Sequence, residues 1–262
     1  CEMDQGEIIE FDENYNYVRA LGDPNCIGLT VAYRPKRITV DSVGRMYVLV
    51  NNCYEGFVEL DPEGNFNRYV GATPVTVSLG DRSWRSFQTE AQQARSSLWL
   101  PTTYSDLAID ADGFIYASIA DSTSKDPIRK LNASGDDVMP ENEFTERPMG
   151  DYDESGKSLS NLTNIAVADD GRFAVLDSVY SRIFVSSSDG NLMYEFGGSG
   201  NAEGKLNSPV GICFMDEKVL VVDLAYQSVE VFAPTEYGHL INQGLEAQSR
   251  YDYDEAAGYW QQ

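Results

Sequence analysis

The chain has 262 residues and carries 42 Asp and Glu against 19 Lys and Arg, so its formal net charge is −23. Such acidity excludes a nucleic-acid-binding surface, which needs clustered Lys and Arg, and docking on anionic lipid heads. No apolar run approaches the roughly 18 residues of a membrane span, so we expect no membrane insertion in this segment. His239 is the single histidine, which excludes mechanisms that need two histidines and argues against a His-based triad or a zinc site.

Four segments repeat one pattern, in which alternating apolar residues lead into an Asp/Gly turn and the alternation then resumes. They are residues 38–50, 107–119, 165–176 and 211–222. The pattern is typical of a β-hairpin, because alternation places every second side chain on one face of a strand and Gly accepts the backbone angles of a tight turn. The fourth copy has Glu217 where the other copies have the turn glycine.

A second hairpin pattern follows each copy about 20 residues further along the chain. It covers residues 57–66, 128–135 and 183–192, the last copy ends in 229–234, and residues 8–17 match it without a first hairpin. Two hairpins per unit give four short strands, and four-stranded units of roughly 40–50 residues are typical of propeller blades. We therefore predict an all-β chain in which residues 1–234 form a partial β-propeller.

These segments resemble NHL-repeat β-propellers, whose units read Val-Asp-x-x-Gly-x-Ile-Tyr-Val-x-Asp, a short loop, and then Ile-x-Val-x-Asp-x-x-Gly. The resemblance covers about residues 1–234 and implies a gluconolactonase-like fold. A closed ring needs more blades than this sequence holds, and Cys1 falls within a strand pattern. We therefore expect a longer, six-bladed parent protein whose N-terminal blades precede Cys1.

Residues 73–104 interrupt the propeller pattern. Apolar residues at helical spacing predict a helical insertion there, and these are Trp84, Phe87, Ala91, Ala94 and Leu98. Two interpretations remain open. Either the helix caps the propeller and buries Trp84, or it presents a contact surface for an acidic partner. The candidate contact residues are Arg85, Arg95 and Trp99, because Trp and Arg dominate binding hot spots.

After Pro234 the apolar period changes from 2 to about 3.6, which predicts a short α-helical hairpin in residues 235–262. The segment from Tyr251 to Trp260 is similar to the second helix of a tetratricopeptide unit, in which small residues such as Ala256 allow close helix contact. A simple α-hairpin is the alternative. A propeller followed by such helices resembles exported or membrane-anchored proteins of Gram-positive bacteria, which implies an extracytoplasmic location for the parent protein.

A polar residue recurs in the loop between the two hairpins of each unit. The four are Asn51, Asp121, Asp177 and Asp223. If they occupy one place in each blade, they ring one end of the propeller axis. The gluconolactonase relatives hold a divalent metal there with Glu, Asn and Asp side chains, so the resemblance implies Ca²⁺ or Mg²⁺. The alternative is structural, because such a carboxylate also accepts backbone N–H bonds within its own loop.

Two functions remain open on these observations. The scarcity of catalytic motifs favours a non-catalytic scaffold that binds a protein, a peptide or another ligand and needs no cofactor. The other function is a divalent-metal-dependent lactonase or esterase of the gluconolactonase-like type. The sequence assigns no catalytic residue and no firm metal ligand. A series of thermal melts with Ca²⁺ and Mg²⁺ separates the two hypotheses, because a bound metal stabilises the folded state.

Overall fold

The structure is a computed structural model that describes residues 1–29, 31–72, 103–121, 124, 126–140, 149–154 and 159–262. The predicted helical insertion therefore lies almost wholly outside the described residues, as do Trp84, Arg85, Arg95 and Trp99. Among the described residues, no helix is both long and apolar enough to cross a membrane.

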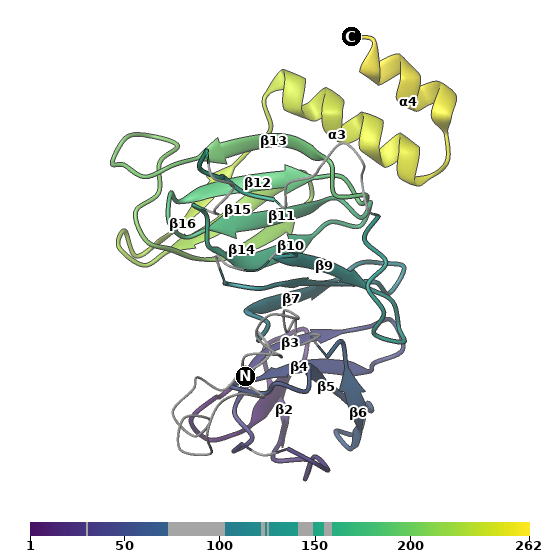
Figure 1. The fold of residues 1–262 in the computed structure, drawn as a ribbon, viewed down its shortest axis with the longest axis vertical. Coiled ribbons are helices and arrows are strands. Elements are labelled where there is room, and N and C mark those ends of the chain that lie inside the picture. The colour runs from purple at the N-terminus through teal and green to yellow at the C-terminus, as the bar shows by residue number, and fades with distance from the viewer. Residues whose placement is uncertain (30, 73–102, 122–123, 125, 141–148, 155–158) are drawn as a thin grey trace, which may run out of the picture.

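The described residues form five antiparallel sheets that follow one another in chain order (Figure 1). The first is the hairpin of β1 (Ile8–Phe11) and β2 (Tyr17–Leu21). The second contains β3 (Pro35–Val40), β4 (Met46–Val50), β5 (Phe57–Leu60) and β6 (Phe66–Val70). The third contains β7 (Asp106–Ile109), β8 (Ile115–Ser118) and β9 (Ile128–Leu131). The fourth contains β10 (Leu162–Val167), β11 (Phe173–Asp177), β12 (Arg182–Ser186) and β13 (Leu192–Gly197). The fifth contains β14 (Pro209–Met215), β15 (Lys218–Asp223) and β16 (Ser228–Phe232).

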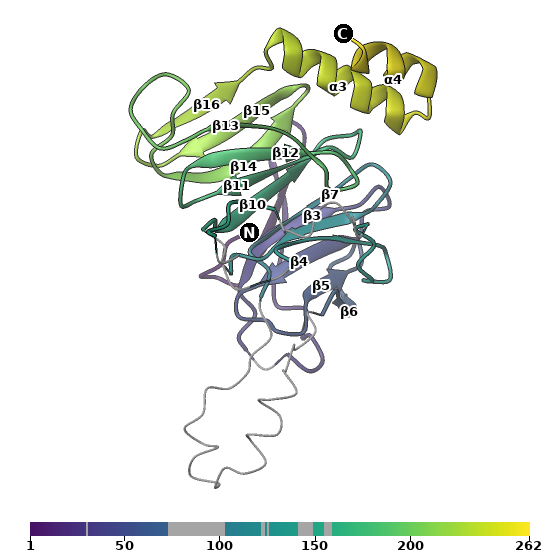
Figure 2. The same cartoon turned by 45° about the horizontal axis from the view of Figure 1, so that its top comes forward.

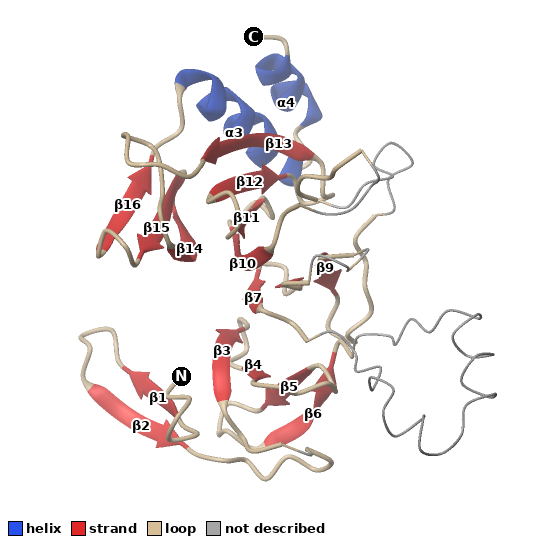
Figure 3. Cartoon of the chain, turned by 60° about the vertical axis from the view of Figure 1, so that its left-hand side comes forward, coloured by secondary structure: helices blue, strands red, loops and turns tan. Residues whose placement is uncertain are grey.

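This arrangement confirms the predicted partial β-propeller. Each of the four larger sheets begins with an inner strand, and these strands are β3, β7, β10 and β14. Successive inner strands contact one another, and Figure 3 shows them facing the middle of the arc that the sheets describe. Later strands of each sheet lie further out, as in a propeller blade.

The hairpin turns explain why the repeat pattern contains glycine in three copies and not in the fourth. Gly44, Gly113 and Gly171 have φ angles of 85°, 86° and 79°, in the region that residues with a Cβ rarely adopt. In the fourth copy Met215 pairs with Lys218, so the loop shortens to two residues. Asp216 takes the positive φ there, at 54°, so Glu217 does not need to be glycine.

A hydrophobic core lies between each pair of successive sheets. Ile8 of the first hairpin packs with Val48 and Val58 of the second sheet, and Phe57 packs with Ile115 of the third. Tyr116 contacts Phe173 of the fourth sheet, with ring centroids 5.2 Å apart. The last core joins the fourth and fifth sheets through apolar residues that include Leu176, Ile183 and Val221. Stability therefore comes from stacking neighbouring blades, as in other repeat proteins.

The chain ends in the predicted helical hairpin, α3 (Glu236–Ser249) and α4 (Tyr253–Trp260). Figure 2 shows both helices beside the fourth and fifth sheets. Asn242 of α3 is buried and accepts a hydrogen bond from the Tyr194 hydroxyl at 2.9 Å. Gly244 lies so close to α4 that an added Cβ would come within 2.8 Å of the Trp260 ring. The last strand ends at Phe232 and α3 begins at Glu236, on either side of the predicted boundary between residues 1–234 and 235–262.

Candidate functional site

The loop aspartates of the fourth and fifth sheets tie two segments of their own sheet together. Asp177 ends β11 and Asp223 ends β15, and both are fully buried. The Asp223 carboxylate accepts hydrogen bonds of 2.7–3.3 Å from the backbone N–H groups of Asn207, Ser208, Ala225 and Tyr226. Asp177 Oδ1 accepts from the N–H groups of Asn161 and Val179 at 3.0 and 2.9 Å. Each carboxylate thus joins the loop after the second strand to the segment that leads into the first.

Asn51 and Asp121 occupy different places. Asp177 and Asp223 pair with the first residues of β10 and β14, whereas Val50 pairs with the first residue of β3. Asn51 lies one residue further on, where its backbone N–H donates to the Arg34 carbonyl at 2.9 Å. The N–H of Asp121 donates to the Ile119 carbonyl, beyond the end of β8. Of the four predicted ring residues, the structure brings only Asp177 and Asp223 to equivalent positions.

The loop residues do not match the metal site that the resemblance implies. Among the described residues, no three His, Cys, Asp or Glu side chains converge to hold a metal ion. Both carboxylate oxygens of Asp223 already accept backbone N–H groups. Ca²⁺ and Mg²⁺ need several oxygen ligands around one point, and these loops do not supply them. We therefore derive no chemistry from a metal at this position.

The inner strands carry a different set of residues toward the axis. The strands direct large apolar side chains into the cores between sheets, and these are Ile38 of β3, Leu107 and Ile109 of β7, Ile165 and Val167 of β10, and Ile212 and Phe214 of β14. Since side chains alternate along a strand, the residues on either side of Ile38, Leu107, Ile165 and Ile212 lie on the other face of their strand. The first row contains Arg37, Asp106, Asn164 and Gly211, and the second contains Thr39, Ala108, Ala166 and Cys213.

Both rows line a pocket of about 470 Å³, within the roughly 300–1,000 Å³ typical of small-molecule sites. The same strands also contribute large apolar residues to the lining, and between them lie small residues, above all Gly211 and the two alanines of the second row. The large residues are Leu107, Ile109, Ile165, Val167, Ile212 and Phe214. In β3, β10 and β14 the strand register shifts just before the first-row residue. Such bulges re-aim side chains and are common beside functional sites.

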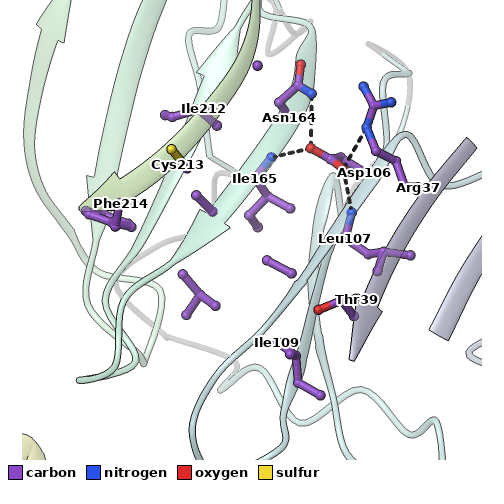
Figure 4. Close-up of a pocket in the computed structure, with 14 residues that line it drawn as sticks. Arg37, Thr39, Asp106, Leu107, Ile109, Asn164, Ile165, Ile212, Cys213 and Phe214 are labelled. Carbon is purple, nitrogen blue, oxygen red and sulfur yellow. Dashed lines mark hydrogen bonds and ion pairs between the residues drawn. The ribbon is translucent and has the colours of Figure 1, made fainter. Parts of the chain in front are cut away.

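Asp106 is the centre of a polar network at one end of this pocket (Figure 4). Its Oδ1 accepts the backbone N–H of Leu107 at 3.0 Å and lies 3.1 Å from Nε of Arg37. Its Oδ2 accepts Nδ2 of Asn164 at 3.0 Å and the backbone N–H of Ile165 at 3.3 Å. Four donors from three neighbouring strands therefore converge on one carboxylate, which is 8% exposed.

The electrostatics of the network follow from its burial. Burial raises the pKa of the Asp106 carboxyl, and the hydrogen bond from Asn164 and the charge of Arg37 oppose this only in part. Burial also lowers the pKa of the adjacent Lys36 ammonium, with the charge of Arg37 as the second cause. The Arg37 side chain is 41% exposed. Arg37 is therefore a half-exposed cation in the pocket lining of a chain of net charge −23.

The sequence analysis did not predict this site, because it relied on polar residues that recur at one place in each repeat. The first-row position directly precedes the repeated apolar residue, and its identity differs in every copy. The signal was therefore variation at a fixed place within a constant pattern. Arg37, Asp106 and Asn164 interrupt strands whose other residues obey apolar alternation, and a polar residue facing inward in such a strand needs a partner or a function.

Comparisons with known proteins find the fold and no closer relationship. No protein-family model and no curated protein sequence match the chain. A gluconolactonase from Xanthomonas campestris is 14% identical with a TM-score of 0.52, over 90% of this chain and 71% of that one. An aldose sugar dehydrogenase from Streptomyces coelicolor, solved with bound PQQ, is 14% identical with a TM-score of 0.50, over 89% and 73%. Virginiamycin B lyase from Staphylococcus aureus is 14% identical with a TM-score of 0.46, over 89% of this chain.

The chain spans 65% of the length of that lyase, less than two thirds. At this level of identity the similarity to the gluconolactonase and the dehydrogenase shows a shared propeller fold. Folds of this kind carry many functions, so the site has to be read from its own residues.

Proposed function

We propose that this chain is a non-catalytic binding module whose axial pocket takes a small molecule. The observation that supports it is the Asp106 network, in which four donors hold one carboxylate in the wall of the pocket. A group held in this way is a fixed part of the pocket wall, and rigid walls bind ligands with little loss of conformational entropy.

The chemistry of the lining supports binding over catalysis. A general base needs a lone pair that is open to substrate, and both oxygens of Asp106 are engaged. Cys213 and Thr39 are the nucleophile candidates in the lining. His239 does not line the pocket and lies in α3, where it pairs with Glu217 at 2.7 Å.

Our proposal for the partner concerns the C-terminal helices. The close contact between Gly244 and Trp260 and the burial of Ala256 suit a tetratricopeptide-like pair, which stacks with further helices and binds peptides. We propose that residues 235–262 begin such a region in an extracytoplasmic or membrane-anchored parent protein, where it binds a protein or peptide. The gluconolactonase named above favours the hydrolase alternative by its fold alone.

A thiol-protection assay tests the pocket. Cys213 lines the pocket and is exposed, Cys1 is exposed elsewhere, and Cys26 and Cys53 are buried. Three probes of equal length, hexanoate, hexanamide and hexylamine, are added before iodoacetamide, and labelling of each cysteine is followed by peptide mass spectrometry. We expect at least one probe to slow alkylation of Cys213 and none to affect Cys1. Failure of all three probes would overturn the proposal.

Two additions complete the design. Ala166→Leu fills the second row and should abolish the protection, whereas Ala20→Leu, on an exposed position of β2, should leave it intact. Thermal melts with CaCl₂ and MgCl₂ address the hydrolase alternative. Binding of either metal at micromolar concentration would raise Tm by mass action and favour the lactonase, whereas an unchanged Tm is the expected result.

A further inference from the structure

We propose that the ligand of the axial pocket is a short aliphatic carboxylate, whose carboxylate group binds Arg37 and whose chain lies along the second row. This inference rests on the proposed function and specifies its ligand. Three features of the pocket support it: the N–H donors that Arg37 retains, the engagement of both Asp106 oxygens, and the small side chains of the second row.

Arg37 is the group with unused donors. A guanidinium has five N–H groups, and among the described residues its contacts are Nε with Asp106 and Nη1 with the Lys36 carbonyl, each at 3.1 Å. The remaining N–H groups lie at the polar end of the pocket on a side chain that is 41% exposed. Arginine recognises a carboxylate through two parallel hydrogen bonds, and its contact with Asp106 already fixes the guanidinium in place.

Asp106 argues against a cationic ligand. An ammonium group would need a free carboxylate lone pair. Oδ2 of Asp106 accepts two donors, and Oδ1 accepts one and forms the ion pair with Arg37. Arg37 supplies the positive charge at this end. The polar end therefore offers donors and positive charge to an incoming group, and an anion with planar oxygens satisfies both.

The second row determines the chemical nature of the ligand beyond its carboxylate group. Ala108, Ala166 and Cys213 offer no strong hydrogen-bonding group, and Thr39 supplies one hydroxyl. These side chains lie two residues along the strands from the first row, or about 7 Å at 3.3 Å per residue. A slender aliphatic chain attached to the carboxylate would cover this surface and exclude water from it, which favours binding.

Binding of hexanoate and hexanamide, measured by titration calorimetry, tests the ligand class. The two probes share a chain and differ in the charge of the head group. We expect hexanoate to bind at least about tenfold more tightly, the factor that a charge-assisted hydrogen bond contributes. Equal affinity for both would overturn the carboxylate and leave a neutral-ligand pocket, and tighter binding of hexylamine would overturn it in favour of a cation. Failure of every probe, together with unprotected Cys213, would remove the proposed function as well.

Arg68 supplies a matched control for Arg37. Its side chain is 44% exposed and pairs with Glu59 at 2.9 Å, much as Arg37 pairs with Asp106, but it lies on β6 outside the pocket. Arg37→Gln should remove the preference for hexanoate over hexanamide, and Arg68→Gln should retain it. Arg37→Lys, which keeps the charge and loses the planar fork, should retain part of it. If Arg37→Gln does not fold, the comparison of the two probes on the unmodified chain still decides the proposal.

Discussion

The buried carboxylates of this propeller have two kinds of partner, although they look alike in the sequence. Asp223 accepts backbone N–H groups of its own sheet, whereas Asp106 also takes donors from the sheets before and after it. The first kind holds one blade together, and the second lies at the seam between three blades, beside a pocket. The difference teaches that the partners of a carboxylate, and not its recurrence, indicate its role.

The largest expected effect is on stability, at the loop position. Asp223→Ala leaves four backbone N–H groups near a buried site without their acceptor. A hydrogen bond to a charged group contributes about 1.5–3 kcal/mol and four donors lose theirs, so we expect the free energy of unfolding to fall by about 3 kcal/mol or more. Urea unfolding followed by circular dichroism measures it. A loss below about 1 kcal/mol would mean that water replaces the carboxylate and that the clamp is unimportant.

Asp177→Ala should cost less, which sharpens the comparison within the loop position. Asp177 accepts two backbone N–H groups through Oδ1, and its buried Oδ2 has no hydrogen-bond partner among the described residues. We expect a loss of about 2 kcal/mol in the same urea experiment. A cost equal to or greater than that of Asp223→Ala would show that the number of donors does not determine the effect.

Ala166→Leu should have little effect on stability, because its side chain grows into the pocket and not into a core between sheets. We expect a change within about 1 kcal/mol, in contrast to the 1–3 kcal/mol that overpacking a core costs. The same variant should lose protection of Cys213 by the hexanoate probe. A large drop in Tm would show that Ala166 packs in a core between sheets and would contradict its place in the pocket wall.

The smallest expected effect is a pair of opposite pH dependences. Burial alone would raise the pKa of Asp223, but its backbone N–H partners outweigh burial and lower it. The stability it contributes is therefore present above the unfolded pKa of about 3.9 and is lost as the pH falls through the lower folded pKa. Burial raises the pKa of Asp106, so its ionisation disfavours folding as the pH rises from about 3.9 through the folded pKa.

Urea unfolding between pH 3 and pH 7 with Asp223→Asn and Asp106→Asn measures both dependences. The stability difference between unmodified chain and variant should grow with rising pH for Asp223→Asn. For Asp106→Asn, the stability difference should shift in favour of the variant as the pH rises from 3 to 7. Two dependences of the same sign would contradict the assignment of opposite surroundings to the two carboxylates.

The sequence predicted the blades well because their signals are local. Alternation and the Asp/Gly turns act within a few residues, so the hairpins that contain Gly44, Gly113 and Gly171 could be predicted from the sequence alone. The two helices after Pro234 were confirmed for the same reason. The residues that lie opposite one another on paired strands could not be predicted in the same way, because strand register depends on neighbouring strands that sequence spacing does not fix.

The site shows where local signals end. Recurrence in the loop between the two hairpins grouped Asn51 with Asp177, but strand pairing puts Val50 at that position. The convergence of Arg37, Asp106 and Asn164 joins residues from three repeats, and no single repeat contains the pattern. Such a site can be recognised only when it is known which residues of neighbouring inner strands lie next to one another.

The central claim is that the axial row binds ligand and the loop position holds the fold, and one paired measurement tests it most directly. Hexanoate affinity and the free energy of unfolding are measured for Asp106→Asn and Asp223→Asn together. The account predicts that Asp106→Asn changes hexanoate affinity several-fold, since Arg37 loses the carboxylate that positions it and neutralises its charge. It predicts that Asp223→Asn is less stable but binds hexanoate unchanged. Weaker binding in Asp223→Asn, with unchanged binding in Asp106→Asn, would contradict it.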